Sequence, residues 1–523
     1  MRRGALPLLI AGLALLTYCQ FPGHTWLQQD SQIYAPILEH QRDPSALRND
    51  ILVQHPHVAF TLYDEAALSL RDLSGQSLHA VLAFQQIVTR ALGIWGLYLM
   101  ASALGLSTIP ALTVAAICSL GAAITGPAVL TFEYEPTPRA FAVPLLLLAI
   151  GLTAHRRYSW AAVAAACAIL YHAPTTWPFL ALFVPLACWR KQWESLSILA
   201  AAVAILAVVS RGQTGQSLFG TLTPLQEQLQ RMRASYNWIS LWPLLLPYQW
   251  ALVMACAVAA FYRLRRRVPP ELGVFTLALP ALGILSMPVS WLLLDRWKWI
   301  LLPQVQPMRA LLFTALLMQF LAASAGVTAS AMRKWPEAIA WFAAAYLLPL
   351  EPDLTHLARD WSIQRTAVLL ALAALCAWTP AAALVASLSA FLAIPILGGV
   401  VNYPKLHTPE LAELSNWART FTPRDAVFLF PEAGHHLDPG VFRAESLRAV
   451  YVDWKGGGQV NYLSEFATEW WFRWQQTMQG FRATDLPRYQ ALGIRYVVSL
   501  PKDHLPHAPV FQNAGYAVYD LQH

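Results

Sequence analysis

Residues 129–141 read VLTFEYEPTPRAF and place two carboxylates and a guanidinium between two long apolar runs. Charges at the edge of a membrane are costly, so Glu133, Glu135 and Arg139 are candidates for a functional site. Alternate side chains of an extended segment point the same way, which predicts a shared partner for the two glutamates. That partner is either a hard divalent cation, Mg²⁺ or Mn²⁺, or an acceptor molecule beside a donor phosphate held by Arg139. A solvated turn that ends a helix is the alternative.

Four further polar residues lie near apolar runs. Asp30 and Tyr34 lie in HTWLQQDSQIYAPILEH (24–40), and a carboxylate at Asp30 could deprotonate a hydroxyl if burial raised its pKa. Its alternative role is to cap the helix at 31–40, and Tyr34 could orient it. Arg309, in QVQPMRALLF, could hold a phosphate with its planar fork or extend to the membrane interface. His172, in ILYHAPTTWPF, could bond a phosphate or a sugar hydroxyl, or satisfy a helix end.

The composition indicates a polytopic membrane protein. The chain has 523 residues, of which 57% are hydrophobic and 12% are charged. Soluble domains carry roughly a quarter charged residues, and a run of about 18 apolar residues is long enough to cross a bilayer. The net charge of +7 is therefore interpreted as a signal of topology rather than of nucleic-acid binding.

About thirteen membrane-spanning helices are expected. The basic clusters at 155–159, 189–191, 263–267 and 332–334 then fall on the same side as Arg2 and Arg3, which is the cytoplasmic side by the positive-inside rule. The expected spans are 5–19, 84–104, 109–131, 140–155, 160–172, 175–189, 195–210, 243–262, 271–293, 310–330, 337–350, 364–378 and 381–400.

Several long segments then face the outer side. The first outer loop, 21–83, and residues 224–242 have the helix-like spacing of interfacial helices, and the loops 295–309 and 351–362 are also outer. Residues 402–523 alternate short β-rich runs with helical ones, which predicts a small soluble α/β domain with a mostly parallel sheet after a transmembrane domain at 1–401.

One polar run of this C-terminal domain, FRAESLRAVYVDWKGGG (442–458), could face the membrane domain. Its alternative interpretation is a strand end followed by a loop, with the glycines at 456–458 as a flexible stretch.

An acid shortly after the first helix, a long first outer loop with interfacial helices, and the acidic turn Glu133-Tyr134-Glu135 together resemble the GT-C glycosyltransferase superfamily. The layout is similar to its oligosaccharyltransferase and mannosyltransferase-like members. The resemblance implies that Asp30 is the catalytic carboxylate. The chain departs from the family because Ser31 rather than Glu follows Asp30, because the first loop has no acid-x-acid motif, and because the tryptophan-rich sequon-binding motif is missing.

The expected function is therefore an enzyme: a bacterial inner-membrane glycosyltransferase with an inverting carboxylate-base mechanism. Its donor would be a polyprenyl-phosphate sugar and its acceptor a glycan, lipid or protein on the periplasmic side, with membrane lipids around it and no nucleic acid. The N-terminus would be cytoplasmic and the C-terminal domain periplasmic. A transporter or flippase of an envelope lipid or glycan is the alternative, as is a non-catalytic scaffold with the GT-C fold.

Overall fold

The computed structural model describes residues 5–56, 61–124, 126–211, 219–348, 362–398, 406–501 and 508–522. Most of the chain forms a bundle of apolar helices, as expected. They are α1 (Ala5–Cys19), α5 (Leu78–Ala103), α6 (Thr108–Ser119), α7 (Pro138–Ala154), α8 (Tyr158–Trp189), α9 (Trp193–Val209), α11 (Leu246–Leu264), α12 (Pro270–Ser290), α14 (Leu311–Ala331), α15 (Trp335–Leu347), α16 (Ser362–Trp378) and α17 (Pro380–Gly398).

The bundle is that of a multi-pass membrane protein. Among the described residues, four helical segments are long and apolar enough to cross a membrane by length and composition, and several apolar helices are shorter. The number of crossings, about thirteen, stays a prediction.

Helix α14 lies at the centre of the bundle, and every residue from Leu311 to Ser330 is buried. Helices α5 and α7 pack so closely that a Cβ on Gly96 of α5 would collide with the backbone of Leu147 on α7. Small residues allow such close backbone approach in membrane helices. This contact fixes α7, whose first turn carries Arg139.

Helix α8 folds back on itself. A straight helix of its 32 residues would be about 48 Å long. Arg156 and Arg190, which flank its two ends, nevertheless both bond the same carboxylate oxygen of Glu271, at 3.1 and 2.8 Å. The fold-back is at His172, whose backbone is non-helical (φ −160°, ψ 83°). The two separate helices expected at 160–172 and 175–189 agree with this geometry.

The basic clusters gather at one face of the bundle. Glu271 joins the cluster at 155–159 to the cluster at 189–191. Glu337 in turn bonds Arg263 at 2.5 Å and lies 3.9 Å from Lys334. We call this the basic face, and the opposite face, where α7 begins, the site face.

The helix expected at 109–131 is wrong in its second half. Helix α6 ends at Ser119, and Gly121 follows with a φ of +84°, a conformation that favours glycine and ends helices. A short antiparallel hairpin of β1 (Ala123–Ile124) and β2 (Val129–Leu130) comes next. It brings the Glu133 and Glu135 segment to the site face.

Short elements connect the long helices at the site face. Helices in the first outer loop and after residue 223 agree with the interfacial helices expected there, whereas residues 351–361 lie outside the described residues. These connecting elements are α2 (Ser31–Arg42), α3 (Ile51–Gln54), α4 (Tyr63–Ser74), α10 (Pro224–Arg233), η1 (Ser235–Asn237), η2 (Ile239–Leu241), η3 (Trp291–Arg296), α13 (Leu302–Val305) and η4 (Pro307–Ala310).

A five-stranded sheet lies in the C-terminal segment, with strand order β4-β3-β5-β7-β6. The expectation of a mostly parallel sheet is wrong in part, because β3 pairs parallel with β4 and β5 whereas β7 pairs antiparallel with β5 and β6. The predicted domain boundary at 401–402 lies outside the described residues. The elements are α19 (Pro409–Phe421), β3 (Val427–Leu429), α20 (Asp438–Ser446), β4 (Ala449–Val450), η6 (Gly456–Asn461), α21 (Ser464–Thr477), η7 (Ala483–Asp485), α22 (Leu486–Ala491), β5 (Tyr496–Ser499), β6 (Phe511–Gln512) and β7 (Ala517–Asp520).

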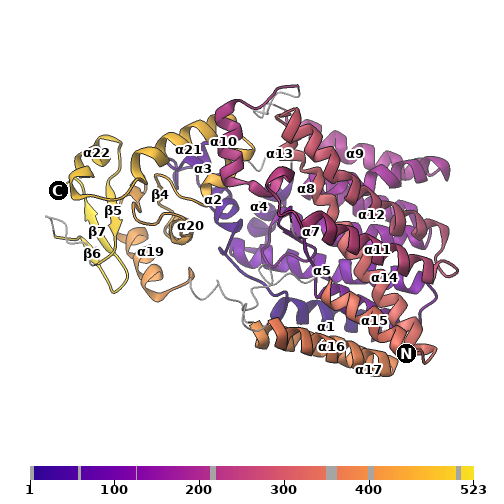
Figure 1. Ribbon diagram of the computed structural model, residues 1–523. Helices are drawn as coiled ribbons and strands as arrows, with labels where there is room; N and C mark the ends of the chain where they lie inside the picture. The colour runs from indigo at the N-terminus through magenta and orange to yellow at the C-terminus, as the bar shows by residue number, and fades with distance from the viewer. Residues whose placement is uncertain are drawn as a thin grey trace.

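Figure 1 shows this sheet at one end of the molecule, the long helices at the other, and α2, α3, α10, α20 and α21 between them. A buried ion network joins the first outer loop to the C-terminal segment. Arg443 of α20 bonds Asp50 at 2.6 Å and also bonds Asp453, and all three side chains are at most 1% exposed. Asp453 also accepts the Gly456 N–H at 2.9 Å. The glycine run at 456–458 is therefore not a flexible loop but part of η6, in which Gly456 and Gly457 are buried.

Replacing Arg443 with Met leaves two buried carboxylates without their cation. We expect the free energy of unfolding to fall by about 3–5 kcal/mol. The measurement is denaturant or thermal unfolding of the purified chain in detergent. The matched control is Arg48→Met, because Arg48 joins the same two segments through Asp425 in an exposed pair worth at most about 1 kcal/mol. Equal losses in the two variants would contradict the role of the network.

Candidate active site at the site face

Asp30 is placed at the start of α2, but it does not cap that helix. It occupies the N-cap position without a side-chain capping hydrogen bond. Its carboxylate instead forms an ion pair with Lys455, whose Nζ donates to Asp30 Oδ1 at 2.7 Å. The Asp30 side chain is still 42% exposed, whereas Lys455 is 16% exposed. The carboxylate is thus held by a cation and remains accessible to a ligand.

Glu135 fixes the backbone around Asp30. One of its oxygens accepts the N–H groups of Gln28 and Gln29, at 2.8 and 2.7 Å, and the hydroxyl of Ser31 at 2.6 Å. The other oxygen accepts the Ser31 N–H at 3.3 Å. Burial raises the pKa of Glu135, and the nearby Asp30 charge adds to this, against the opposing effect of these hydrogen bonds. Glu135 therefore holds the Asp30 loop in one conformation.

Glu133 has different partners. It accepts a hydrogen bond from Arg139 Nε at 2.8 Å and from the Leu130 N–H at 3.2 Å, and the pair with Arg139 is about nine-tenths buried. The shared partner expected for the two glutamates is therefore not what the structure shows. Glu133 accepts from Leu130 and Arg139, whereas the donors to Glu135 come from residues 28–31.

The divalent cation expected beside the two glutamates stays a prediction. Both glutamates are engaged by protein N–H and O–H groups, and no cluster of three or more His, Cys, Asp or Glu side chains that could hold a metal occurs among the described residues. Hard cations such as Mg²⁺ or Mn²⁺ need several oxygen ligands.

Arg309 contributes a second guanidinium to the site. It lies in η4, directly before α14, and its charge interacts with Arg139, Asp30, Tyr236 and Tyr462. Its Nε is buried without a hydrogen-bond partner, and within the described residues it forms no ion pair with a carboxylate. A buried cation next to another cation calls for an anion that the protein does not supply.

The charges around Asp30 lower its pKa. Desolvation of the partly exposed carboxylate by the surrounding protein would alone raise its pKa, but Lys455, Arg139 and Arg309 together hold the pKa of Asp30 well below its usual range. The carboxylate is therefore ionised at neutral pH and is a weak base while it is paired with Lys455. This is opposite to the raised pKa that the sequence suggested for a catalytic base.

Tyr34 and His172 lie at the same face. Tyr34 follows Asp30 by one helical turn, packs against Tyr63 at 5.5 Å between ring centres, and has a pKa raised by burial and by Asp30. His172 lies at the fold-back of α8, where its Nδ1 is 2.8 Å from the Thr175 hydroxyl. The roles expected for Tyr34 and His172, in orienting a partner and in binding a phosphate or a sugar hydroxyl, stay predictions.

Lys455 was not among the predicted site residues. Its signal was the polar run at 442–458, which was considered as a segment that could face the membrane domain. Three contacts hold this run against the site face. Arg233 of α10 donates to the Trp454 carbonyl and stacks on its ring at 3.5 Å, and Gln304 donates to the Tyr462 carbonyl at 2.9 Å. The Arg443 network fixes Asp453, two residues before Lys455.

Arg90 was also missed. It lies in α5, is 1% exposed, and donates hydrogen bonds to the carbonyls of Thr17, Gly23 and Glu133 at 2.9, 2.6 and 2.6 Å. It therefore ties the end of α1 to the acidic segment, which keeps Asp30 and Glu135 within reach of each other.

Comparison with known proteins gives a short family match and distant structural similarities. Residues 409–477 match a family described as a domain of unknown function (DUF6798), a stretch that includes Arg443, Asp453 and Lys455. No curated protein matches the chain.

Two solved proteins are similar in structure. Arabinofuranosyltransferase AftD from Mycobacteria is 16% identical with a TM-score of 0.45, over 95% of this chain and 35% of that one. A mutant of the same protein has a TM-score of 0.47 and 16% identity, over 100% of this chain and 42% of that one, so this chain spans well under half of the AftD length. ArnT from Cupriavidus metallidurans, bound to undecaprenyl phosphate, is 14% identical with a TM-score of 0.40, over 99% of this chain and 98% of that one.

All three similarities are below 25% identity and have TM-scores below 0.5. At these identities and TM-scores they carry no argument about substrate or mechanism, and only the contacts of the site bear on its chemistry.

Replacing Glu135 with Gln removes a carboxylate oxygen that accepts hydrogen bonds from the Asp30 loop. The amide N–H group of the new side chain then faces the N–H groups of that loop. We expect the free energy of unfolding to fall by about 2–4 kcal/mol. Unfolding in detergent measures this, and proteolysis near residues 27–31 should become faster. Glu194→Gln is the control, because Glu194 accepts one exposed hydrogen bond from Ser159. Unchanged stability in Glu135→Gln would contradict the clamp.

Proposed function

We propose that this chain is a glycosyltransferase that moves a sugar from a polyprenyl-phosphate-linked donor to an acceptor hydroxyl at the site face. The observation that carries the proposal is the juxtaposition of an accessible, ionised Asp30 with Lys455, Arg139 and the buried Arg309. An anion-binding group and a carboxylate base at one depth are what a lipid-linked donor requires.

The phosphate of the donor binds to Arg309 and Arg139. Arg309 has a buried Nε without a partner and interacts with the neighbouring charge of Arg139. A guanidinium binds a phosphate through two parallel hydrogen bonds, and an anion between two arginines removes their repulsion. A phosphate attached to a membrane-embedded chain reaches this depth because Arg309 stands directly before α14.

Asp30 acts as the base in an inverting displacement. The acceptor oxygen attacks the anomeric carbon of the donor and its proton passes to the Asp30 carboxylate. The bond between the anomeric carbon and the phosphate oxygen breaks, and the polyprenyl phosphate leaves with the electron pair, stabilised by Arg309 and Arg139.

Lys455 couples donor binding to the strength of the base. In the free protein, burial raises the pKa of Asp30, whereas the charge of Lys455 lowers it. When the donor phosphate attracts Lys455, burial acts on Asp30 with less opposition and its pKa rises toward the working pH. A base that strengthens when the donor is present abstracts the acceptor proton at the right moment.

Glu133 and Glu135 support this chemistry without a metal ion. Glu133 balances one charge of Arg139 and keeps it in place, and Glu135 holds the Asp30 loop. Tyr34 orients Asp30 from the next turn of α2, and His172 shapes the α8 fold-back.

We assign the site face to the outer side of a bacterial inner membrane. The support is the gathering of basic clusters at the opposite face, since cytoplasmic loops carry an excess of Lys and Arg. The C-terminal segment, which contributes Lys455, then lies on the periplasmic side. It covers the site and contacts the acceptor, a hydroxyl of a glycan, a lipid or a protein.

Replacing Asp30 with Asn removes the base while keeping the shape of the side chain. We expect glycosyl transfer to fall by about 10²–10⁴-fold, the range for a lost general base. The assay uses purified protein in detergent, a panel of polyprenyl-phosphate sugars and a membrane extract as acceptor. Asp43→Asn is the control, because Asp43 is a first-loop aspartate that pairs with Arg424 away from the site. Equal transfer by both variants would contradict the assignment, as would the absence of transfer by the parent with every donor.

A further inference from the structure

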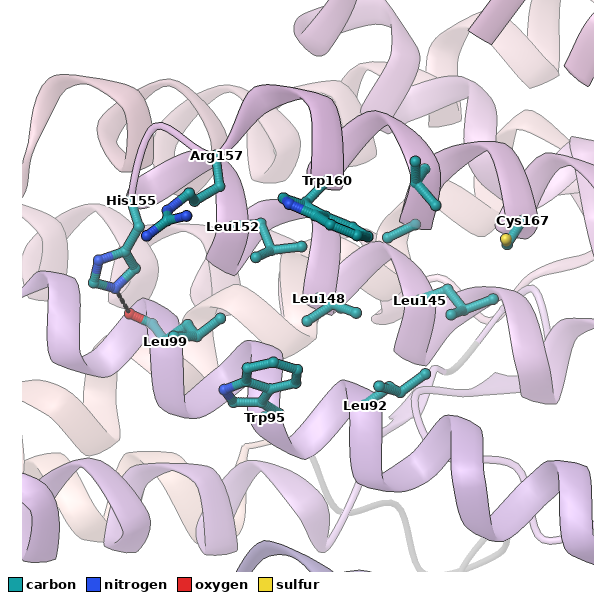
Figure 2. A pocket seen from close by; sticks show the side chains of 12 residues that line it. Leu92, Trp95, Leu99, Leu145, Leu148, Leu152, His155, Arg157, Trp160 and Cys167 are labelled. Carbon is teal, nitrogen blue, oxygen red and sulfur yellow. Dashed lines mark hydrogen bonds between the residues drawn. The ribbon is translucent and has the colours of Figure 1, made fainter. Parts of the chain in front are cut away.

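A cavity of about 680 Å³ opens on the outside of the bundle between α5, α7 and α8 (Figure 2). Its walls are almost wholly apolar, and the side of the cavity is open, since Trp95 and Trp160 are 41% and 65% exposed. We call it the lipid-facing groove. Its lining residues are Leu92, Trp95, Leu99, Leu145, Leu148, Leu152, His155, Arg157, Trp160, Val163, Ala164 and Cys167.

The groove runs along α7 from near its middle to the basic face. Figure 2 shows Leu92, Leu145 and Cys167 at one end and His155 with Arg157 at the other. The polar end follows the last turn of α7, whereas Arg139 stands at the first turn of the same helix, about 25 Å away for 17 residues. The groove is therefore separate from the Asp30 site.

Arg157 places a positive charge at the mouth of the groove. Arg156 has a φ of +58°, and it turns away to bond Glu271. Arg157 itself lines the groove and, among the described residues, forms no ion pair or hydrogen bond through its guanidinium. It also occupies the N-cap position of α8 without a side-chain cap, so that the positive end of the helix dipole adds to its charge.

Trp160 and Trp95 indicate that the mouth of the groove lies at the level of the lipid headgroups. Trp160 follows Arg157 by three residues and lies across the groove from Trp95 in Figure 2. Tryptophan prefers the level of lipid headgroups, where its ring is both apolar and a hydrogen-bond donor. His155 closes the end by bonding the Leu99 carbonyl at 3.0 Å.

We propose that the lipid-facing groove binds one anionic diacyl phospholipid from the leaflet at the basic face. The lipid phosphate bonds Arg157 and the first turn of α8, and one acyl chain lies along the leucines of α5 and α7. Basic pockets between membrane helices recognise anionic headgroups in this way. The proposal does not depend on the glycosyltransferase activity.

The test is native mass spectrometry of the delipidated full chain with dioleoyl phosphatidylglycerol or dioleoyl phosphatidylcholine. The parent should retain phosphatidylglycerol selectively, and Arg157→Gln should weaken its retention by about fivefold. Arg266→Gln is the matched control, because Arg266 is an exposed arginine of the same face that does not line the groove. Ala164→Trp fills the apolar part of the groove and should reduce retention of both lipids.

Three results would overturn the proposal. One is equal retention of the two lipids by the parent. Another is equal loss in Arg157→Gln and Arg266→Gln, which would mean that the whole face attracts anions without a site. The third is displacement of phosphatidylglycerol by farnesyl phosphate at equal concentration, which would make the groove an isoprenoid site instead. Arg157→Gln changes an exposed side chain and leaves the fold intact. It therefore tests the proposal even where Ala164→Trp fails to fold.

Discussion

The ion pair between Asp30 and Lys455 is the interaction on which the rest of the site depends. Its two residues come from the first outer loop and from the C-terminal segment, and the nitrogen–oxygen distance is 2.7 Å. An exposed pair of this kind contributes little stability. Here the buried Arg443 network holds the two segments together, so the pair forms as a consequence of the fold. The C-terminal segment is thereby part of the site, and it controls the ionisation of the one carboxylate that remains accessible.

The three acidic residues of the site differ because their surroundings differ. Glu135 is buried among backbone N–H groups and fixes a loop, and Glu133 is paired with Arg139. Asp30 alone combines a strong field from cations with an open side chain. The same chemical group thus serves as a clamp, as a counter-ion and as a base. Arg309 completes the arrangement because its buried Nε lacks a protein partner.

The sequence predicts the helices well because long apolar runs have a strong signal, and it predicts the fold-back of α8 because basic residues flank both of its halves. It also predicts that Asp30, Glu133, Glu135, Arg139 and Arg309 lie at one face. It does not predict that Glu133 and Glu135 diverge, since the hairpin of β1 and β2 sets the direction of that segment. Lys455 could not be assigned because its partner lies 425 residues away in sequence, and the buried η6 was interpreted as a flexible glycine loop.

The pH dependence of kcat/KM in Lys455→Met tests the central claim most directly, because this parameter reports ionisations of the free enzyme. In the parent, Lys455 lowers the pKa of Asp30, so activity persists to low pH and is lost only as Asp30 is protonated there. Without Lys455, burial acts with less opposition, the pKa of Asp30 rises, and we predict that the acid limb of the profile moves to higher pH. Lys298→Met, which removes a lysine paired with Glu227, should leave the limb in place. An acid limb at the same pH in the parent and in Lys455→Met would contradict the account.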